Sequence, residues 1–352
     1  LDKVAWMKAT SSAAGIALGA GFSGGIITAI VGLSFGLDHP IGQPLLVLSF
    51  FIPALAIQDF WRFAAFSIAK PKMALWNDAV WAVTQGIAFC MIWLLIRVQP
   101  AWMIAGWGTG ALAGAIFGLW QFQTMPALGW QSFLAWLREH ASLSGWLGLE
   151  NLIYSAGSQI TSILIAAIVG RAALGGIQSI TNLFGPGSLF SQASQTIGLP
   201  LASKAMAEGG PGAVRRTVIQ YSLFVGLCLT AYALLILGAG PILLNKIFGE
   251  AFTEYSALIL PLTLGFLLNF WSNGAFIGLI STAAGSKLAG VQLCVFATQI
   301  LAVSVMGLQF GILGVAWALP AIAAVRFMGL WLMCLKATRP VAFSGLGIIR
   351  LK

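Results

Sequence analysis

Long runs of apolar residues alternate with short polar segments along the whole chain. A helix needs about 20 apolar residues to cross the roughly 30 Å hydrocarbon core of a bilayer. The pattern predicts ten such helices, at about residues 11–34, 45–69, 75–96, 101–122, 149–170, 177–201, 217–239, 255–282, 287–308 and 312–335. The predicted fold class is therefore an all-α integral membrane protein.

Basic residues are distributed unevenly between the two sets of alternate helix ends. One set carries Lys3, Lys8, Lys70, Lys72, Arg138, Lys204, Arg215, Arg216, Lys287, Lys336, Arg339, Arg350 and Lys352, and the other only Arg97, Arg171 and Lys246. Because cytoplasmic loops are enriched in Lys and Arg, we expect both termini to be cytoplasmic. The chain is predicted to be a multi-pass protein of the cytoplasmic membrane.

The composition agrees with this interpretation and limits the partners. Hydrophobic residues make up 59% of the chain and charged residues 8%, whereas a soluble domain has about 25% charged residues. The net charge of +9 is spread over short loops beside the membrane. It therefore indicates membrane lipids as partners, and not nucleic acid.

The last four predicted helices resemble the first four. The matches are Pro53 with Pro261, Phe60-Trp61 with Phe270-Trp271, residues 82–85 with 296–299, Trp107 with Trp317, and residues 118–120 with 329–331. Five matches in order, at offsets of 208 to 214 residues, predict a parallel repeat of two bundles. The chain begins at Leu1 and not at Met, so we expect a second six-helix bundle preceded by four helices of a first one that lacks two.

Polar residues are concentrated in the fifth and sixth predicted helices. The sixth is interrupted by Gly-Pro-Gly at 185–187, which predicts a break or bend that membrane proteins tolerate where protein or a water-filled cavity covers it. We expect a substrate cavity here, with interhelical hydrogen bonding as the alternative role. The candidate lining residues are Glu150, Asn151, Tyr154, Gln159, Asn182, Gln192 and Gln195.

Three charged residues within other spans are further candidates. Asp59 and Arg62 stand one turn apart, so they either neutralise each other or place Arg62 in the cavity as an anion site, with Asp59 orienting it or carrying a proton. Arg326 has no acidic residue within a turn. It either binds a phosphate or diphosphate, which suits the fork of a guanidinium, or extends to the membrane surface.

Four glycines recur at every fourth position of the fourth predicted helix. Gly106, Gly110, Gly114 and Gly118 therefore form one stripe, and small residues in such a stripe let membrane helices approach closely. We interpret the stripe as a helix-packing surface and not as a binding site.

Several chemical classes are disfavoured. No phosphate-binding P-loop, nucleophile elbow or zinc-protease motif occurs, and the four cysteines are scattered through apolar segments. We expect no metal site, no cofactor and no catalytic residues, and an enzyme is the weaker hypothesis because the outer loops are short.

The order of several segments resembles that of a known family. They are LPLASKAMAEGG (199–210), AVRRTVIQYS (213–222), KIFGEAFTEYSALILPL (246–262), AAGSK (283–287) and FGILGVAWALPAIAAV (310–325). The chain is similar to polysaccharide-biosynthesis flippases of the multidrug/oligosaccharidyl-lipid/polysaccharide exporter superfamily. The domains expected are residues 1–122 as an incomplete first bundle, 123–148 as a cytoplasmic linker loop, 149–340 as a six-helix bundle and 341–352 as a cytoplasmic tail.

The resemblance implies a secondary transporter of the bacterial cytoplasmic membrane that works by alternating access. It would flip undecaprenyl-diphosphate-linked oligosaccharides for cell-surface polysaccharide synthesis, with Arg62 and Arg326 placed to serve as cavity arginines. Glycan polymerases and other envelope assembly proteins would be its partners. The alternatives are a multidrug or cation exporter of the same superfamily, and a non-transporting membrane component or enzyme of envelope glycan assembly.

Overall fold

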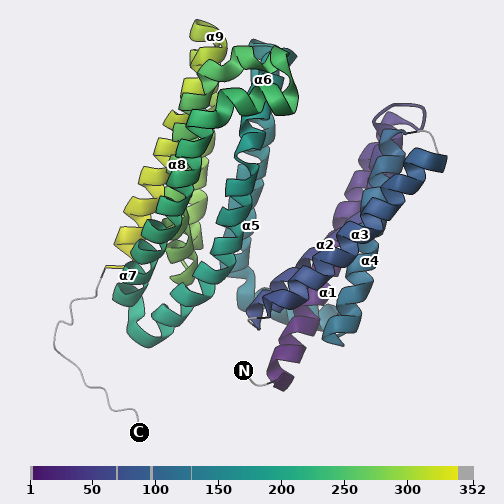
Figure 1. Ribbon diagram of the computed structural model, residues 1–352. Helices are drawn as coiled ribbons and strands as arrows, with labels where there is room; N and C mark the ends of the chain where they lie inside the picture. Colours follow the sequence, from purple (N-terminus) through teal and green to yellow (C-terminus); the bar gives the residue numbers. More distant parts are fainter. Residues whose placement is uncertain (1–2, 69, 96–97, 128, 340–352) are drawn as a thin grey trace, which may run out of the picture. The chain divides into compact units, whose positions relative to one another are not determined.

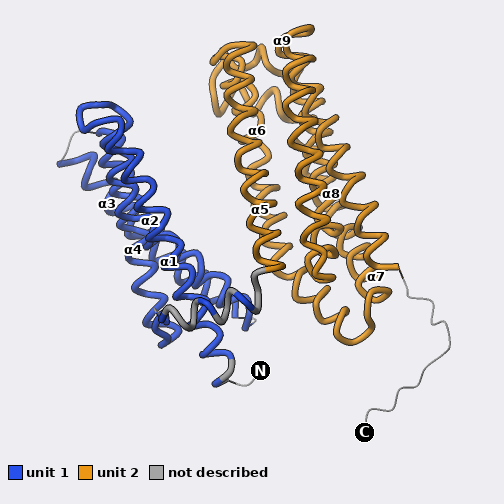
Figure 2. Tube along the Cα trace, turned by 180° about the vertical axis from the view of Figure 1, so that it is seen from behind, with its two compact units in different colours: residues 1–141 blue, residues 142–352 orange. Residues whose placement is uncertain are grey.

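The computed structural model describes residues 3–68, 70–95, 98–127 and 129–339, and gives no side-chain placement for part of residues 3–5 and 130–141. These residues form helices and no strand. The chain divides into two compact units, residues 1–141 and 142–352 (Figure 2). The predicted tail at 341–352 lies outside the described residues.

Unit 1 contains four antiparallel helices (Figure 1): α1 (Lys3–Phe35), α2 (Gly42–Ser67), α3 (Pro71–Leu95) and α4 (Pro100–Phe122). Helix α1 packs against α2, and α4 packs against both α2 and α3. Trp61 is fully buried at the centre of this unit and stacks on Phe122, with ring centroids 5.2 Å apart. Apolar side chains therefore fill the interior of unit 1.

The glycine stripe of α4 provides this close approach. All four glycines are buried. A Cβ atom added to Gly110 would lie 2.8 Å from the main-chain oxygen of Trp81 on α3, and one added to Gly114 would lie 2.9 Å from Cγ of Gln58 on α2. The stripe therefore accommodates residues of both neighbouring helices.

Unit 2 contains the remaining elements. They are α5 (Trp130–Ile168, which begins in unit 1), α6 (Arg171–Leu183), α7 (Gly185–Phe248), the 3-10 helix η1 (Glu250–Leu258), α8 (Ile259–Ser281) and α9 (Gly285–Ala337). Helices α7 and α9 each contain one glycine outside the helical region, Gly210 with φ 67° and Gly311 with φ 61°. Positive φ favours glycine, and at these points each helix is divided into two spans.

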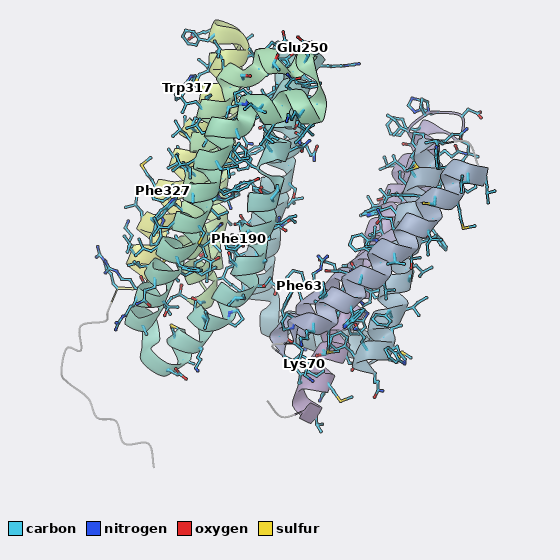
Figure 3. The ribbon with its side chains drawn as sticks, viewed as in Figure 1. Phe63, Lys70, Phe190, Glu250, Trp317 and Phe327 are labelled. Carbon is cyan, nitrogen blue, oxygen red and sulfur yellow. The ribbon has the colours of Figure 1, made fainter. Side chains whose placement is uncertain are left out.

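The predicted all-helical membrane fold is confirmed. Eight helical segments among the described residues are long and apolar enough to cross a membrane. The breaks at Gly210 and Gly311 divide α7 and α9 into parts that each exceed the roughly 20 residues needed for a span, in keeping with the ten predicted helices. Apolar side chains such as Phe63, Phe190 and Trp317, which are labelled in Figure 3, are 58%, 44% and 45% exposed.

One predicted boundary was wrong. The segment 177–201 is not one helix, because α6 ends at Leu183 and α7 begins at Gly185, after a turn in which the Phe184 amide donates to the Thr181 carbonyl. The expected break at Gly-Pro-Gly is confirmed, since Pro186 lies in the first turn of α7, where its missing amide proton costs nothing. Within the predicted linker 123–148, helix α5 begins at Trp130 and continues into the fifth span; the cytoplasmic side of this segment stays a prediction.

Candidate functional site

A cavity of about 470 Å³ lies inside unit 2. Helices α5, α6, α8 and both parts of α9 line it, together with the first part of α7. The polar residues among its walls are Tyr154, Ser158, Thr181, Ser188, Ser191, Gln192, Gln195, Asn269, Asn273, Gln292, Gln299 and Arg326. This volume is within the range of about 300–1,000 Å³ that small-molecule sites occupy.

The polar wall on α7 follows from helical spacing. Ser188, Ser191, Gln192 and Gln195 occupy positions i, i+3, i+4 and i+7, so they share one face of the helix. The facing wall comes from α8, where the Asn273 side-chain amide donates a 2.6 Å hydrogen bond to Ser191 Oγ. The break before Gly185 directs this face of α7 into the unit.

The cavity contains one cationic side chain, Arg326 of α9. Its guanidinium carbon lies 5.3 Å from the centroid of the Tyr154 ring on α5, within the range of a cation–π interaction. Among the described residues Arg326 forms no ion pair, and its buried Nε has no hydrogen-bond partner. The guanidinium therefore brings to the cavity a positive charge that no described carboxylate in contact neutralises.

Glu150 is an acidic residue that interacts electrostatically with Arg326. It is buried, with 8% exposure, on α5 one turn before Tyr154, and it forms no ion pair with Arg326. Glu150 is not among the lining residues. Glu150 therefore takes up none of the guanidinium donors of Arg326.

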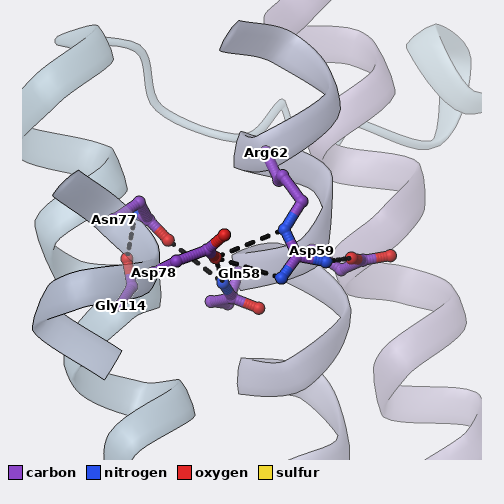
Figure 4. A network of polar contacts seen from close by, with 6 residues as sticks. All are labelled: Gln58, Asp59, Arg62, Asn77, Asp78 and Gly114. Atoms are coloured by element: carbon purple, nitrogen blue, oxygen red, sulfur yellow. Dashed lines mark hydrogen bonds and ion pairs between the residues drawn. The ribbon is translucent and has the colours of Figure 1, made fainter. Parts of the chain in front are cut away.

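The other two predicted charged residues form a network within unit 1 (Figure 4). Arg62 donates through Nη1 to Asp59 Oδ1 at 3.0 Å, and through Nε and Nη2 to Asp78 Oδ1 at 3.2 and 3.1 Å. Gln58 Nε2 donates to both Asp78 Oδ1 and Asn77 Oδ1. Arg62 is thus neutralised by two carboxylates, which leaves the three charged groups with a net charge of −1.

The glycine stripe contributes directly to this network. Asn77 Nδ2 donates a 2.8 Å hydrogen bond to the main-chain oxygen of Gly114, and Gln58 lies against the same glycine. The absence of a side chain at Gly114 lets two polar residues from α2 and α3 lie on α4. Their hydrogen-bonding groups are then satisfied inside the unit, as buried polar groups require.

The structure places the predicted cavity residues in different surroundings. Tyr154, Gln192, Gln195 and Arg326 line the cavity of unit 2. Asn151, Gln159 and Asn182 are exposed and are not among its lining residues. Asn151 and Asn182 instead accept hydrogen bonds from Ser155 and Gln178 of their own helices.

Sequence reasoning missed five polar residues that contribute to these sites: Gln58, Asn77 and Asp78 in unit 1, and Gln292 and Gln299 in unit 2. Asp78 completes the unit 1 network, and an acidic residue inside the predicted span at 75–96 was the available signal. Gln292 and Gln299 line the cavity seven residues apart on α9, a spacing that places them on one face. No group of three or more potential metal ligands occurs among the described His, Cys, Asp and Glu residues.

Comparison with solved structures shows the fold. A structure of a mutant of the Vibrio cholerae MATE transporter VcmN aligns with a TM-score of 0.64 at 15% identity, covering 95% of this chain and 84% of that one. VcmN in a bent form aligns with a TM-score of 0.58 at 16% identity, covering 96% and 84%. No protein-family model and no curated protein sequence matches the chain. The chain therefore has the MATE transporter fold.

Proposed function

We propose that this protein is a membrane transporter that flips a lipid-linked oligosaccharide carrying an anionic phosphate or diphosphate. The observation that carries the proposal is Arg326, a half-buried guanidinium in the cavity of unit 2 that has no carboxylate in ion-pair contact. Arginine binds phosphate oxygens through parallel N–H donors. A phosphate in the cavity would supply the negative charge that Arg326 lacks as a partner among the described residues.

The rest of the cavity suits the sugar portion of such a substrate. Its walls present six amide side chains, each of which offers donors and an acceptor to hydroxyl groups: Gln192, Gln195, Asn269, Asn273, Gln292 and Gln299. Phe266 and Phe270 add apolar ring surface to the same wall. A hydroxyl-rich headgroup with one anionic end therefore matches both the charge and the hydrogen-bonding capacity of the site. If the substrate is a lipid-linked oligosaccharide, the expected partners of the protein are membrane lipids and the proteins that polymerise the exported glycan.

A second candidate function is export of organic cations. Asp59 and Asp78 in unit 1 support it, since Arg62 neutralises only one of their two charges. The MATE fold supports it as well. In this case the excess negative charge of unit 1, and not Arg326, would determine the substrate.

Deletion of the gene in its native host distinguishes the two functions. For a flippase we expect lipid-linked glycan to accumulate on the cytoplasmic leaflet while sensitivity to cationic drugs stays unchanged. Complementation with Arg326→Gln should fail although the protein reaches the membrane, because charge-assisted hydrogen bonds contribute about 1.5–3 kcal/mol each. Unchanged glycan together with raised drug sensitivity would overturn the proposal in favour of cation export.

A further inference from the structure

A groove of about 360 Å³ lies between the two parts of α7 in unit 2. The first part of α7 supplies Ile197 and Leu201, the second part supplies Gln220, Tyr221 and Phe224, and Ile277 of α8 completes the wall. Ile197, Leu201 and Phe224 are 65%, 52% and 68% exposed. The groove therefore opens outward with apolar edges.

The base of the groove is a defined polar contact. The hydroxyl groups of Ser194 and Tyr221 lie 2.7 Å apart and share a hydrogen bond between the two parts of α7. Gly198 allows this approach, since a Cβ atom there would lie 2.7 Å from Tyr221 Cε2. The groove is thus fixed by packing, and its shape does not depend on exposed side chains alone.

Each wall of the groove ends in a cation. On the first part of α7, helical spacing toward the turn at Gly210 leads from Ile197 through Leu201 to Lys204. On the second part, the same spacing toward that turn leads from Phe224 through Gln220 to Arg216. Residues four apart lie on the same face of a helix. Both cations therefore lie one turn beyond the groove, at the end of unit 2 that the basic residues predict to be cytoplasmic.

These two cations are available to a ligand. Both are exposed. Lys204 lies 3.8 Å from Glu208, in an ion pair whose side chains are 70% and 69% exposed, and such surface pairs are weak. Arg216 forms no ion pair with the residues that the structure describes.

We propose that this groove binds one anionic glycerophospholipid of the surrounding bilayer. The headgroup phosphate contacts Lys204 and Arg216, and an acyl chain lies along Ile197, Leu201 and Phe224. A free phosphate would leave the apolar walls unused, and an uncharged lipid would leave the cations unused. The lipid bridges the two parts of α7 across the turn at Gly210. This site does not involve Arg326 and is independent of the proposed transport function.

The experiment compares two lipids of equal chain length on the purified full chain in detergent micelles. Native mass spectrometry measures bound lipid, and thermal unfolding measures stabilisation, on addition of phosphatidylglycerol or phosphatidylcholine. We expect phosphatidylglycerol to bind and to raise the unfolding midpoint more than phosphatidylcholine does. The double variant Lys204→Gln/Arg216→Gln should lower the apparent affinity for phosphatidylglycerol by about tenfold, because each cation at the membrane surface strengthens anionic-lipid binding severalfold.

Two further variants separate the groove from a general charge effect. Lys246→Gln removes an exposed cation from the opposite end of the same helix and should leave phosphatidylglycerol binding unchanged. Leu201→Trp fills the groove with both cations intact and should reduce binding. Equal binding of the two lipids, wild-type affinity in the double variant, wild-type affinity in Leu201→Trp, or equally strong stabilisation by inorganic phosphate would each overturn the proposal.

Discussion

Replacing Gly110 by alanine tests how closely α4 packs against α3. The added Cβ would lie 2.8 Å from the main-chain oxygen of Trp81 and 2.9 Å from Cβ of Gln85, and it would also meet the Trp81 ring. The carbonyl oxygen belongs to the backbone of α3, so rotation of a side chain cannot relieve this contact. The two helices would have to move apart.

The size of the effect follows from two opposing contributions. Overpacking of a well-packed interior costs about 1–3 kcal/mol, whereas alanine gains up to about 1 kcal/mol over glycine in helix propensity. Because the contact involves backbone, we place the overpacking cost in the upper half of its range, about 2–3 kcal/mol. Less about 1 kcal/mol of helix propensity, Gly110→Ala should lower the free energy of unfolding by about 1–2 kcal/mol. Gly86 on α3 is the matched control, because a Cβ there would meet no atom within 4 Å. Gly86→Ala should leave stability unchanged or raise it slightly.

Equilibrium unfolding in mixed micelles with increasing sodium dodecyl sulfate, followed by near-ultraviolet circular dichroism, measures both changes on the full chain. The packing account requires destabilisation at Gly110 and none at Gly86. If Gly110→Ala were as stable as the wild type, or if both variants shifted in the same direction by the same amount, the close approach of α3 and α4 would be refuted.

Two further predictions concern the charged residues. Asp78→Asn should lower the free energy of unfolding by about 1–2 kcal/mol and more than Asp59→Asn does, because Asp78 Oδ1 accepts three hydrogen bonds and Asp59 Oδ1 accepts one. Equal effects in the same detergent unfolding assay would contradict the network. Tyr154→Leu should weaken substrate binding severalfold while Tyr154→Phe retains it, since a cation–π contact contributes about 0.5–2 kcal/mol. Equilibrium binding of a labelled lipid-linked sugar measures both variants, and equal loss in both would assign the effect to the hydroxyl group.

The spans and their interruptions could be predicted because the bilayer imposes them. Backbone groups in hydrocarbon must bond internally, so apolar length alone indicated the helices, and the Gly-Pro-Gly segment indicated the break before α7. Local sequence was sufficient in both cases. The predicted repeat pairs Phe60-Trp61 of α2 with Phe270-Trp271 of α8, and this correspondence stays a prediction.

The partners of the polar residues could not be predicted in the same way. Polar residues cover more than one face of α5, and only the neighbouring helices decide that Tyr154 faces the cavity while Asn151 and Gln159 are exposed. Similarly, Asp59 and Arg62 are one turn apart in sequence, but the pairing of α2 with α3 brings Asp78 to the same guanidinium. Tertiary contacts between distant segments determine both outcomes, and periodicity contains no information on them.

The most direct measurement of the central claim is transport by the purified chain in proteoliposomes. A fluorescent polyprenyl-diphosphate sugar placed in one leaflet becomes accessible to a membrane-impermeant quencher when it is flipped. We expect the wild type to accelerate quenching, Arg326→Lys to retain part of the rate, and Arg326→Gln to lose about tenfold or more, as the loss of a charge-assisted hydrogen bond implies. Undiminished flipping by Arg326→Gln, or failure of the wild type to flip the lipid while it transports an organic cation, would contradict the account.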